Sequence, residues 1–209
     1  STPIKSSAAS DVYKRQIQKD MLRFRRNLER IGEIMAYEIS KTLSYKVEDV
    51  TTPLGTAKCH VPDEQLVLGT IFRAGVPFHQ GFLNYFDHAQ NAFVSAYRKY
   101  KEKENFDVFI EYLASPLLDG KTLILADPML ATGGTLVAAT HYLAERGAKD
   151  ITAVCILGAP EGLKFVEENL DPSIKFKLVL CAVDEKLNDK CYIVPGLGDA
   201  GDRLYGVID

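Results

Sequence analysis

The sequence predicts an α/β protein in which a mostly parallel central sheet is flanked by helices. Short apolar runs alternate with helical periodicity along the chain, a rhythm typical of parallel sheets covered on both faces. The chain has 209 residues, of which 46% are hydrophobic, which is enough for one substantial core. The strand-then-helix pairs are residues 66–72 and 76–85, 122–126 and 133–146, and 151–157 and 161–169.

The N-terminal part divides into a lead and a long helix. Residues 1–14 are rich in Ser, Ala, Pro and Lys and do not open on methionine, which is typical of a flexible lead or a non-native segment. In residues 17–43, apolar side chains recur at spacings of three and four, which predicts an amphipathic helix. We therefore expect a flexible lead over residues 1–16 and one domain over residues 17–209.

Several shorter elements complete the predicted fold. Residues 47–51 and 57–61 flank Thr52-Pro53-Leu54-Gly55, where proline and glycine favour a tight turn, so we expect a hairpin arm. Further strands are expected at residues 92–97, 108–113 and 176–183. The charged residues 99–105 predict an exposed loop, and residues 192–206 contain too much Gly and Asp to predict regular structure.

Composition excludes some classes of function. The net charge of −3 and pI near 5.8 give no global attraction for nucleic acid or an anionic membrane. No apolar run approaches the ~18 residues of a membrane helix, so we expect a soluble, cytoplasmic protein. The cysteines lack C-x-x-C spacing, which favours reduced, structural thiols over metal ligands; they are Cys59, Cys155, Cys181 and Cys191.

The strongest functional motif follows the predicted strand 122–126. Asp-Pro-Met-Leu-Ala-Thr-Gly-Gly-Thr at residues 127–135 leads from this strand into an amphipathic helix. Loop amides and a helix N-terminus that converge in this way form an anion site suited to a phosphate. The glycines allow close backbone approach and the threonines add hydroxyl donors.

The glycines of this loop match neither of two common nucleotide-binding patterns. No Gly-Lys-Ser/Thr follows them, so the loop is not a Walker loop, and it lacks the G-x-G-x-x-G dinucleotide turn. A Gly-Gly pair before a helix also serves tight packing alone, and that alternative to a phosphate site stays open on the pattern by itself.

The same motif carries a family resemblance. A strand, an acidic residue and a Thr-Gly-Gly-Thr loop resemble the ribose-phosphate loop of type I phosphoribosyltransferases. The full sequence of the motif, which begins with Asp-Pro, resembles the uracil-specific branch of that family. The resemblance implies the type I phosphoribosyltransferase fold, with a β-hairpin arm and an irregular C-terminal base-binding loop. It also implies contacts to phosphoribosyl diphosphate from Asp127, Pro128, Met129, Leu130, Ala131, Thr132, Gly133, Gly134 and Thr135.

A Gly-rich segment near the C-terminus forms the second motif. Residues 192–203, Tyr-Ile-Val-Pro-Gly-Leu-Gly-Asp-Ala-Gly-Asp-Arg, are typical of an irregular loop when taken alone. Together with the first motif they resemble the uracil-binding loop of the same family. The resemblance implies uracil contacts from Ile193, Gly198, Asp199 and Ala200, with Asp199 also approaching the phosphoribosyl donor.

The third motif is Thr-Ile-Phe-Arg-Ala-Gly at residues 70–75, which resembles the arginine-bearing diphosphate loop of the family. Arg73 is expected to clamp diphosphate oxygens, since a planar guanidinium can bind them in bidentate fashion. Arg98 matches a second donor-binding arginine, although the residues after it depart from the usual pattern and an ordinary surface arginine remains the alternative.

The three motifs together imply a uracil phosphoribosyltransferase, which converts uracil and phosphoribosyl diphosphate to uridine monophosphate and diphosphate. Asp127, Arg73 and Asp199 are the expected catalytic residues, with Mg²⁺ bound through the substrate diphosphate and not directly by the protein. The resemblance also implies a homodimer or higher homo-oligomer and a possible GTP effector. Two alternatives are a non-catalytic regulator with the same fold and an enzyme that uses another base.

Overall fold

A computed structural model describes residues 20–100 and 106–207, with the side chains of residues 97–100 and 106–109 left aside. The predicted lead over residues 1–16, the start of the first helix and the tip of the predicted 99–105 loop lie outside these ranges. The helices are α2 (Met21–Ser40), α3 (Gly75–Leu83), α4 (Gly134–Ala144), α5 (Pro160–Asn169) and α6 (Ala200–Tyr205). The longer strands are β1 (Tyr45–Thr52), β2 (Gly55–Pro62), β3 (Leu66–Phe72), β4 (Gln90–Tyr100), β5 (Phe106–Ala114), β6 (Thr122–Ala126), β8 (Asp150–Gly158) and β9 (Lys175–Val183).

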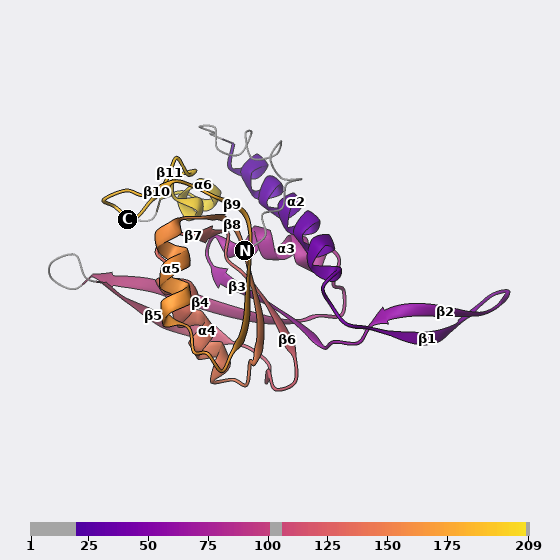
Figure 1. Cartoon of the computed structure of the whole chain (residues 1–209). Helices are drawn as coiled ribbons and strands as arrows, with labels where there is room; N and C mark the ends of the chain where they lie inside the picture. The colour runs from indigo at the N-terminus through magenta and orange to yellow at the C-terminus, as the bar shows by residue number, and fades with distance from the viewer. Residues whose placement is uncertain (1–19, 101–105, 208–209) are drawn as a thin grey trace.

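A seven-stranded sheet forms the centre of the molecule (Figure 1). Its strands follow the order β5-β4-β3-β6-β8, and β8 also pairs with β9 and with the two-residue strand β7 (Met129–Leu130). The ladders from β4 to β9 are parallel, and β5 pairs with β4 in the antiparallel sense. The predicted α/β class with a mostly parallel sheet is therefore confirmed.

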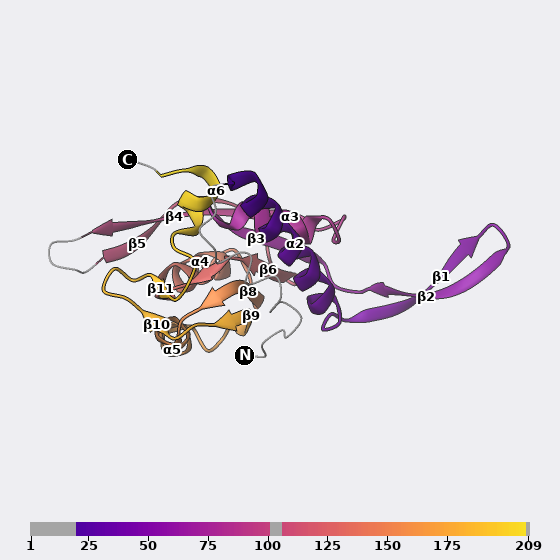
Figure 2. The same cartoon turned by 90° about the horizontal axis from the view of Figure 1, so that it is seen from above.

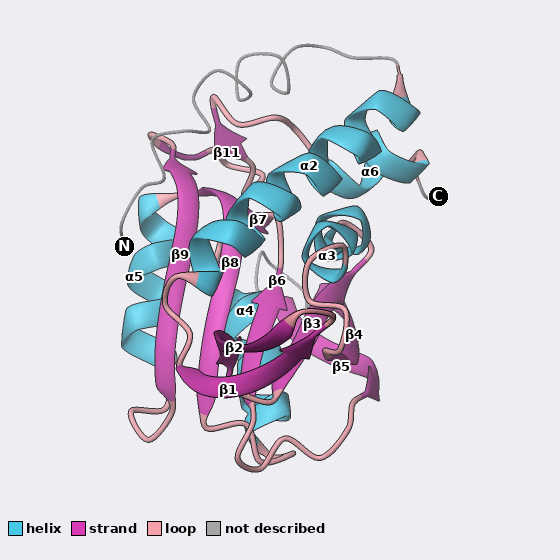
Figure 3. Ribbon diagram, turned by 90° about the vertical axis from the view of Figure 1, so that its right-hand side faces the viewer, coloured by secondary structure: helices cyan, strands magenta, loops and turns pink. Residues whose placement is uncertain are grey.

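Helices cover both faces of this sheet (Figure 3). Along β3, the alternating direction of side chains sends Leu68 into a core shared with α2 and α3 and sends Val67 into a second core shared with α4. The neighbouring strands repeat this division, because Ile124 packs in the first core and Leu123 in the second. Runs of apolar residues in these strands reflect burial on both sides.

Two glycines let α2 and α3 cross at close range. A Cβ added to Gly32 would lie 2.3 Å from the Phe78 carbonyl oxygen, and one added to Gly81 would lie 2.2 Å from the Glu29 carbonyl oxygen. Helix α2 begins where Asp20 accepts a hydrogen bond of 2.9 Å from the Arg23 amide. The close crossing fixes α2 over the sheet.

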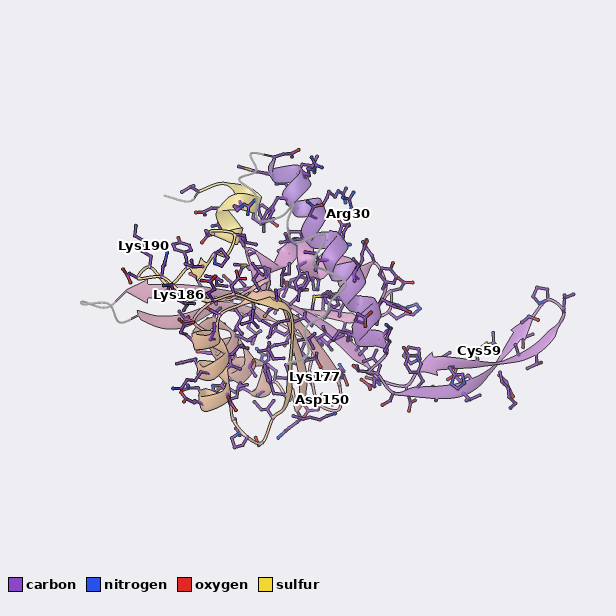
Figure 4. The ribbon with its side chains drawn as sticks, turned by 45° about the horizontal axis from the view of Figure 1, so that its top comes forward. Arg30, Cys59, Asp150, Lys177, Lys186 and Lys190 are labelled. Carbon is purple, nitrogen blue, oxygen red and sulfur yellow. The ribbon has the colours of Figure 1, made fainter. Side chains whose placement is uncertain are left out.

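The predicted hairpin arm is confirmed as β1 and β2, which pair from Thr52 and Gly55 at the turn to Tyr45 and Pro62 at the base. The arm projects away from the rest of the described chain (Figures 1 and 2), and Cys59 lies well out along it (Figure 4). Every residue of β1 is exposed.

The structure differs from the sequence prediction near the C-terminus and in the phosphate loop. Residues 192–206, predicted to be irregular, contain the short strand β11 (Ile193–Val194) and α6. One helical turn forms there because Asp199 caps it and accepts a hydrogen bond of 2.9 Å from the Asp202 amide. The strands β7, β10 (Lys186–Leu187) and β11 are two residues each, too short to give a periodic signal.

Strands β4 and β5 also extend further than predicted, since β4 continues to Tyr100 and takes up the first residues of the expected loop. In the described ranges, no helix combines the length and apolarity that a membrane crossing requires.

Candidate functional site

The predicted diphosphate and phosphate motifs follow neighbouring strands of the sheet. Strands β3 and β6 are parallel partners, with Thr70 opposite Ala126, so Arg73 and Asp127 both follow carboxyl ends at the same edge. Gly75 lets the two segments pack closely, because a Cβ there would lie 2.8 Å from the Ala126 carbonyl oxygen. Ligands of open α/β sheets bind at this edge.

The loop after β6 is fixed along the end of β8. The Asp127 amide donates to the Val154 carbonyl at 3.1 Å, and the Pro128 carbonyl accepts from the Ile156 and Leu157 amides at 2.9 and 3.0 Å. These bonds hold the loop before any ligand is present, and they place part of it alongside β8 as a short strand. Side chains of Leu130 and Pro128 are buried, so these residues can reach a ligand only through their backbone.

The second half of the loop opens α4. Gly133 has φ 82°, a left-handed conformation that glycine adopts without strain, and the helix begins at the next residue. Thr132 and Thr135 are partly exposed beside it. A cavity of about 40 Å³, large enough for roughly three water molecules, is lined by Asp127, Met129, Leu130, Ala131, Thr132, Gly133, Thr135 and Leu136.

A glycine outside the predicted motifs supports this loop from α5. A Cβ added to Gly162 would lie 2.2 Å from the Ala131 carbonyl oxygen, and one added to Gly133 would lie 2.7 Å from the Gly162 carbonyl oxygen. The loop backbone and α5 are therefore in direct contact. Sequence reasoning missed Gly162, because a single glycine near a helix start gives no signal of the distant segment that packs on it.

Asp127 accepts a hydrogen bond within its own loop and acts on a buried thiol through its charge. Its Oδ1 accepts a hydrogen bond of 3.3 Å from the Met129 amide. Cys155, on β8, is fully buried, and burial together with the negative charge of Asp127 raises the pKa of its thiol well above the usual value. The buried Cys155 thiol is thus neutral beside the charge of Asp127.

Arg73 reaches across to the C-terminal segment. Its Nη2 lies 3.0 Å from Asp202 Oδ1, and its Nη1 donates to the Gly206 carbonyl at 3.2 Å. A Cβ added to Gly201 would lie 3.0 Å from Arg73 Nη2 and 3.2 Å from Asp199 Oδ1. The structure thus brings the diphosphate motif and the C-terminal motif together, with Arg73 and Asp199 both close to Gly201.

The predicted uracil-contacting residues divide into buried and exposed pairs. Ile193 and Ala200 are 4% and 5% exposed, so their side chains pack in the core and only their backbone is available. Gly198 and Asp199 are exposed. The turn before them is held by Asp184, which accepts a hydrogen bond of 2.9 Å from the Gly196 amide.

One predicted site residue remains untested, and a second cavity lies away from this site. The backbone of Arg98 lies in β4, but its side chain is outside what the structure describes, so its predicted role is not tested. A larger cavity of about 610 Å³ lies at the C-terminal end of α4, where Glu145, Glu168 and Asp171 outnumber Lys149. Its charge would repel a diphosphate.

In the described ranges, no group of three or more His, Cys, Asp or Glu side chains could hold a metal ion.

Comparisons with known proteins show strong similarity to one family. A model of the uracil phosphoribosyltransferase family matches residues 12–207. The uracil phosphoribosyltransferase of Bifidobacterium adolescentis is 56% identical over 190 residues, covering 89% of this chain and 87% of that protein. That of Porphyromonas gingivalis is 52% identical over 191 residues, covering 91% and 88%.

Two solved structures are also similar to this chain. The AQ2163 protein from Aquifex aeolicus matches with a TM-score of 0.89 and 33% identity, covering 99% of this chain and 98% of that one. A hypoxanthine phosphoribosyltransferase from Staphylococcus aureus matches with a TM-score of 0.50 and 18% identity, covering 79% and 75%. The second likeness confirms the predicted phosphoribosyltransferase fold and nothing more.

Proposed function

We propose how the residues of this site divide the work of one reaction, starting from the fact that the chain belongs to the uracil phosphoribosyltransferase family. It is a transferase that converts uracil and phosphoribosyl diphosphate to uridine monophosphate and diphosphate. The observation that supports the assignment of residues is that the phosphate loop, Arg73 and the C-terminal segment meet at one edge of the sheet.

The loop amides of residues 131–135 and the start of α4 hold the 5′-phosphate of the donor. Gly133 supplies the left-handed conformation that turns the loop into α4, and the partly exposed Thr132 and Thr135 add hydroxyl donors. The preceding part of the loop, residues 127–130, is already fixed along β8, so this part needs no rearrangement when the phosphate binds. Residues 128–130 contribute to donor binding by holding the loop in place along β8.

Asp127 binds the ribose hydroxyls and Arg73 binds the diphosphate. The bond from C1′ to the leaving diphosphate breaks early in such a transfer, so positive charge develops on the ribose and negative charge on the diphosphate oxygens. The Asp127 carboxylate stabilises the former and the Arg73 guanidinium the latter. Arg98, on the neighbouring strand β4, is proposed as a second diphosphate ligand.

Uracil binds to the segment that leads into α6 and to the first residue of that helix. The backbone of Ile193, Gly198 and Ala200 reads the edge of the pyrimidine, since two of these side chains are buried and the third residue has none. Asp199 lies between the base and the donor. Uracil loses its N1 proton in the reaction, and the proposal names no residue as the base that accepts it. The protein's contribution to this step is the positioning of uracil against C1′.

Mg²⁺ would be held at this site by the donor. Hard oxygen atoms of the diphosphate are the ligands that Mg²⁺ prefers, and it is usually held by one or two carboxylates plus substrate phosphates. Here the diphosphate of the donor would hold Mg²⁺ with no direct ligand from the protein, while Asp127 and Asp199 bind the donor itself. When bound, the ion neutralises charge on the leaving diphosphate.

The hairpin arm supports a homodimer or higher homo-oligomer. An isolated two-stranded hairpin is marginally stable in water, and this one exposes Val47 (55%), Val50 (40%) and Leu54 (100%). A second copy of the chain that covers the arm would bury these side chains. A cytoplasmic location, expected from the apolar pattern of the sequence, and a GTP effector, implied by the family resemblance, complete the proposal.

The experiment that tests the reaction and the loop uses uracil, cytosine, hypoxanthine and adenine, each with Mg²⁺ and phosphoribosyl diphosphate, and follows nucleotide formation by chromatography. We expect uridine monophosphate from uracil alone, and a loss of at least ~100-fold in kcat/KM for Asp127→Asn. Asp150→Asn is the matched control, because Asp150 lies at the opposite end of the sheet (Figure 4). Product from another base would overturn the base assignment, and no product from any base would favour a regulator.

A further inference from the structure

The short helix α6 contacts both sides of the proposed site. Asp202, on this helix, is within 3.0 Å of the Arg73 guanidinium. The amide of the same residue donates to Asp199 Oδ1 at 2.9 Å. One residue therefore connects the arginine on the diphosphate side with the acid on the uracil side, although neither the predicted motif roles nor the family comparison assigns it a function.

Helix α6 is itself anchored to the body of the protein. The Arg203 guanidinium lies 4.2 Å over the ring of the buried Phe24 on α2 and donates to the Leu197 carbonyl at 2.9 Å. Arg25, also on α2, donates to the Leu204 carbonyl. These contacts, which place α6 beside α2 (Figure 3), give Asp202 a fixed backbone.

The bonds of Arg73 leave room for a ligand. A guanidinium has five N–H donors, and the Asp202 carboxylate and the Gly206 carbonyl account for one on each terminal nitrogen. The remaining donors of a planar group held at two points have defined directions. The Arg73 side chain is 37% exposed, so diphosphate oxygens can reach it.

We propose that Asp202 is a positioning residue, which orients the Arg73 guanidinium for the leaving diphosphate and links that orientation to the uracil-binding segment through Asp199. The inference rests on the proposed role of Arg73. Without Asp202, Arg73 keeps its charge but loses one of its two fixed contacts, so it must be ordered each time the donor binds.

A purely structural role for Asp202 predicts different behaviour. The Arg73–Asp202 pair is part-exposed on both sides, with side chains 37% and 33% exposed, and ion pairs of this kind contribute little to stability. A structural role would therefore change the melting temperature slightly and leave donor binding alone. Competition between Asp202 and diphosphate for Arg73 is the other alternative, and it predicts tighter donor binding when Asp202 is removed.

The test is a double-mutant cycle with Asp202→Ala and Arg73→Ala, measured as kcat and as KM for phosphoribosyl diphosphate and for uracil. We expect Asp202→Ala to raise KM for the donor about ten-fold, equivalent to ~1.4 kcal/mol, with a smaller effect on KM for uracil. Asp202→Asn, which keeps the acceptor oxygen and removes the charge, should lie between this variant and the wild type. In the Arg73→Ala background, Asp202→Ala should have no further effect on the donor KM.

The outcomes separate this inference from the proposed function. If Arg73→Ala leaves the donor KM unchanged, the assigned role of Arg73 is wrong and the inference falls with it. If Arg73→Ala raises the donor KM but Asp202→Ala leaves it unchanged, lowers it, or adds fully to Arg73→Ala, only the positioning role is overturned. Circular dichroism and melting curves check folding, and Asp202→Asn provides the measurement if the alanine variant does not fold.

Discussion

A methyl group at Gly162 should displace the phosphate loop without touching any proposed ligand-binding side chain. The third residue of α5 lies against the loop so closely that a Cβ would be 2.2 Å from the Ala131 carbonyl oxygen and 3.2 Å from that of Leu130. Both atoms belong to backbone, so a side-chain rotation cannot relieve the contact. Gly162→Ala therefore has to move the loop, the helix, or both.

The size of the effect follows from these distances. Contacts of a Cβ atom below 3.0 Å essentially do not occur, so the oxygen and the methyl group must separate from 2.2 Å to at least that distance. Overpacking of this kind costs ~1–3 kcal/mol, partly offset by the ~1 kcal/mol by which alanine favours a helix over glycine. A misplacement near 1 Å costs up to ~100-fold in rate, so we expect kcat/KM for the donor to fall by ten- to 100-fold.

The assay is the initial rate of uridine monophosphate formation against the concentration of phosphoribosyl diphosphate, together with a melting curve. Gly32→Ala is the matched control, because its Cβ would lie 2.3 Å from the Phe78 carbonyl oxygen at the α2–α3 crossing. It should destabilise the fold without a selective loss of donor binding. A Gly162→Ala enzyme with the wild-type donor KM, or with the same kinetic defect as Gly32→Ala, would refute the reasoning.

Three further predictions concern other parts of the protein. Burial lowers the pKa of His79, so below pH 6.5 the unfolded chain binds more protons than the folded protein. As the pH is lowered further, the unfolding free energy should therefore decrease by up to ~1.4 kcal/mol per pH unit. Urea titrations at several pH values should show a weaker pH dependence for His79→Gln. Arg203→Met keeps much of the packing on α2 but removes the hydrogen bond to the Leu197 carbonyl, so KM for uracil should rise several-fold in steady-state assays while KM for the donor changes less. Cys155 is buried with a raised thiol pKa and Cys59 is half-buried on the arm, so mass spectrometry should find alkylation of the native protein at Cys59 long before Cys155.

The sequence predicted most of the fold because its signals are local. The strand at residues 66–72 was predicted with the bounds it has in the structure, and the hairpin and the loop into α4 lie where proline and glycine indicated. Helix α6 was missed, because the glycines around it outweigh a cap that depends on one carboxylate, that of Asp199. Strand β7 was missed because the residues of β8 with which it pairs lie 28 positions further along the chain.

The sequence by itself determined the class of fold, the phosphate loop and, through resemblance, the family, since each depends on residue types in a fixed order. Only the tertiary structure decided which segments share the site. It placed Gly162 beneath the loop at Ala131 and joined Arg73 to Asp202, 129 residues further along. Such contacts depend on how strands and helices pack in space. A local pattern of residues therefore does not predict which distant residue will lie next to it in the folded protein.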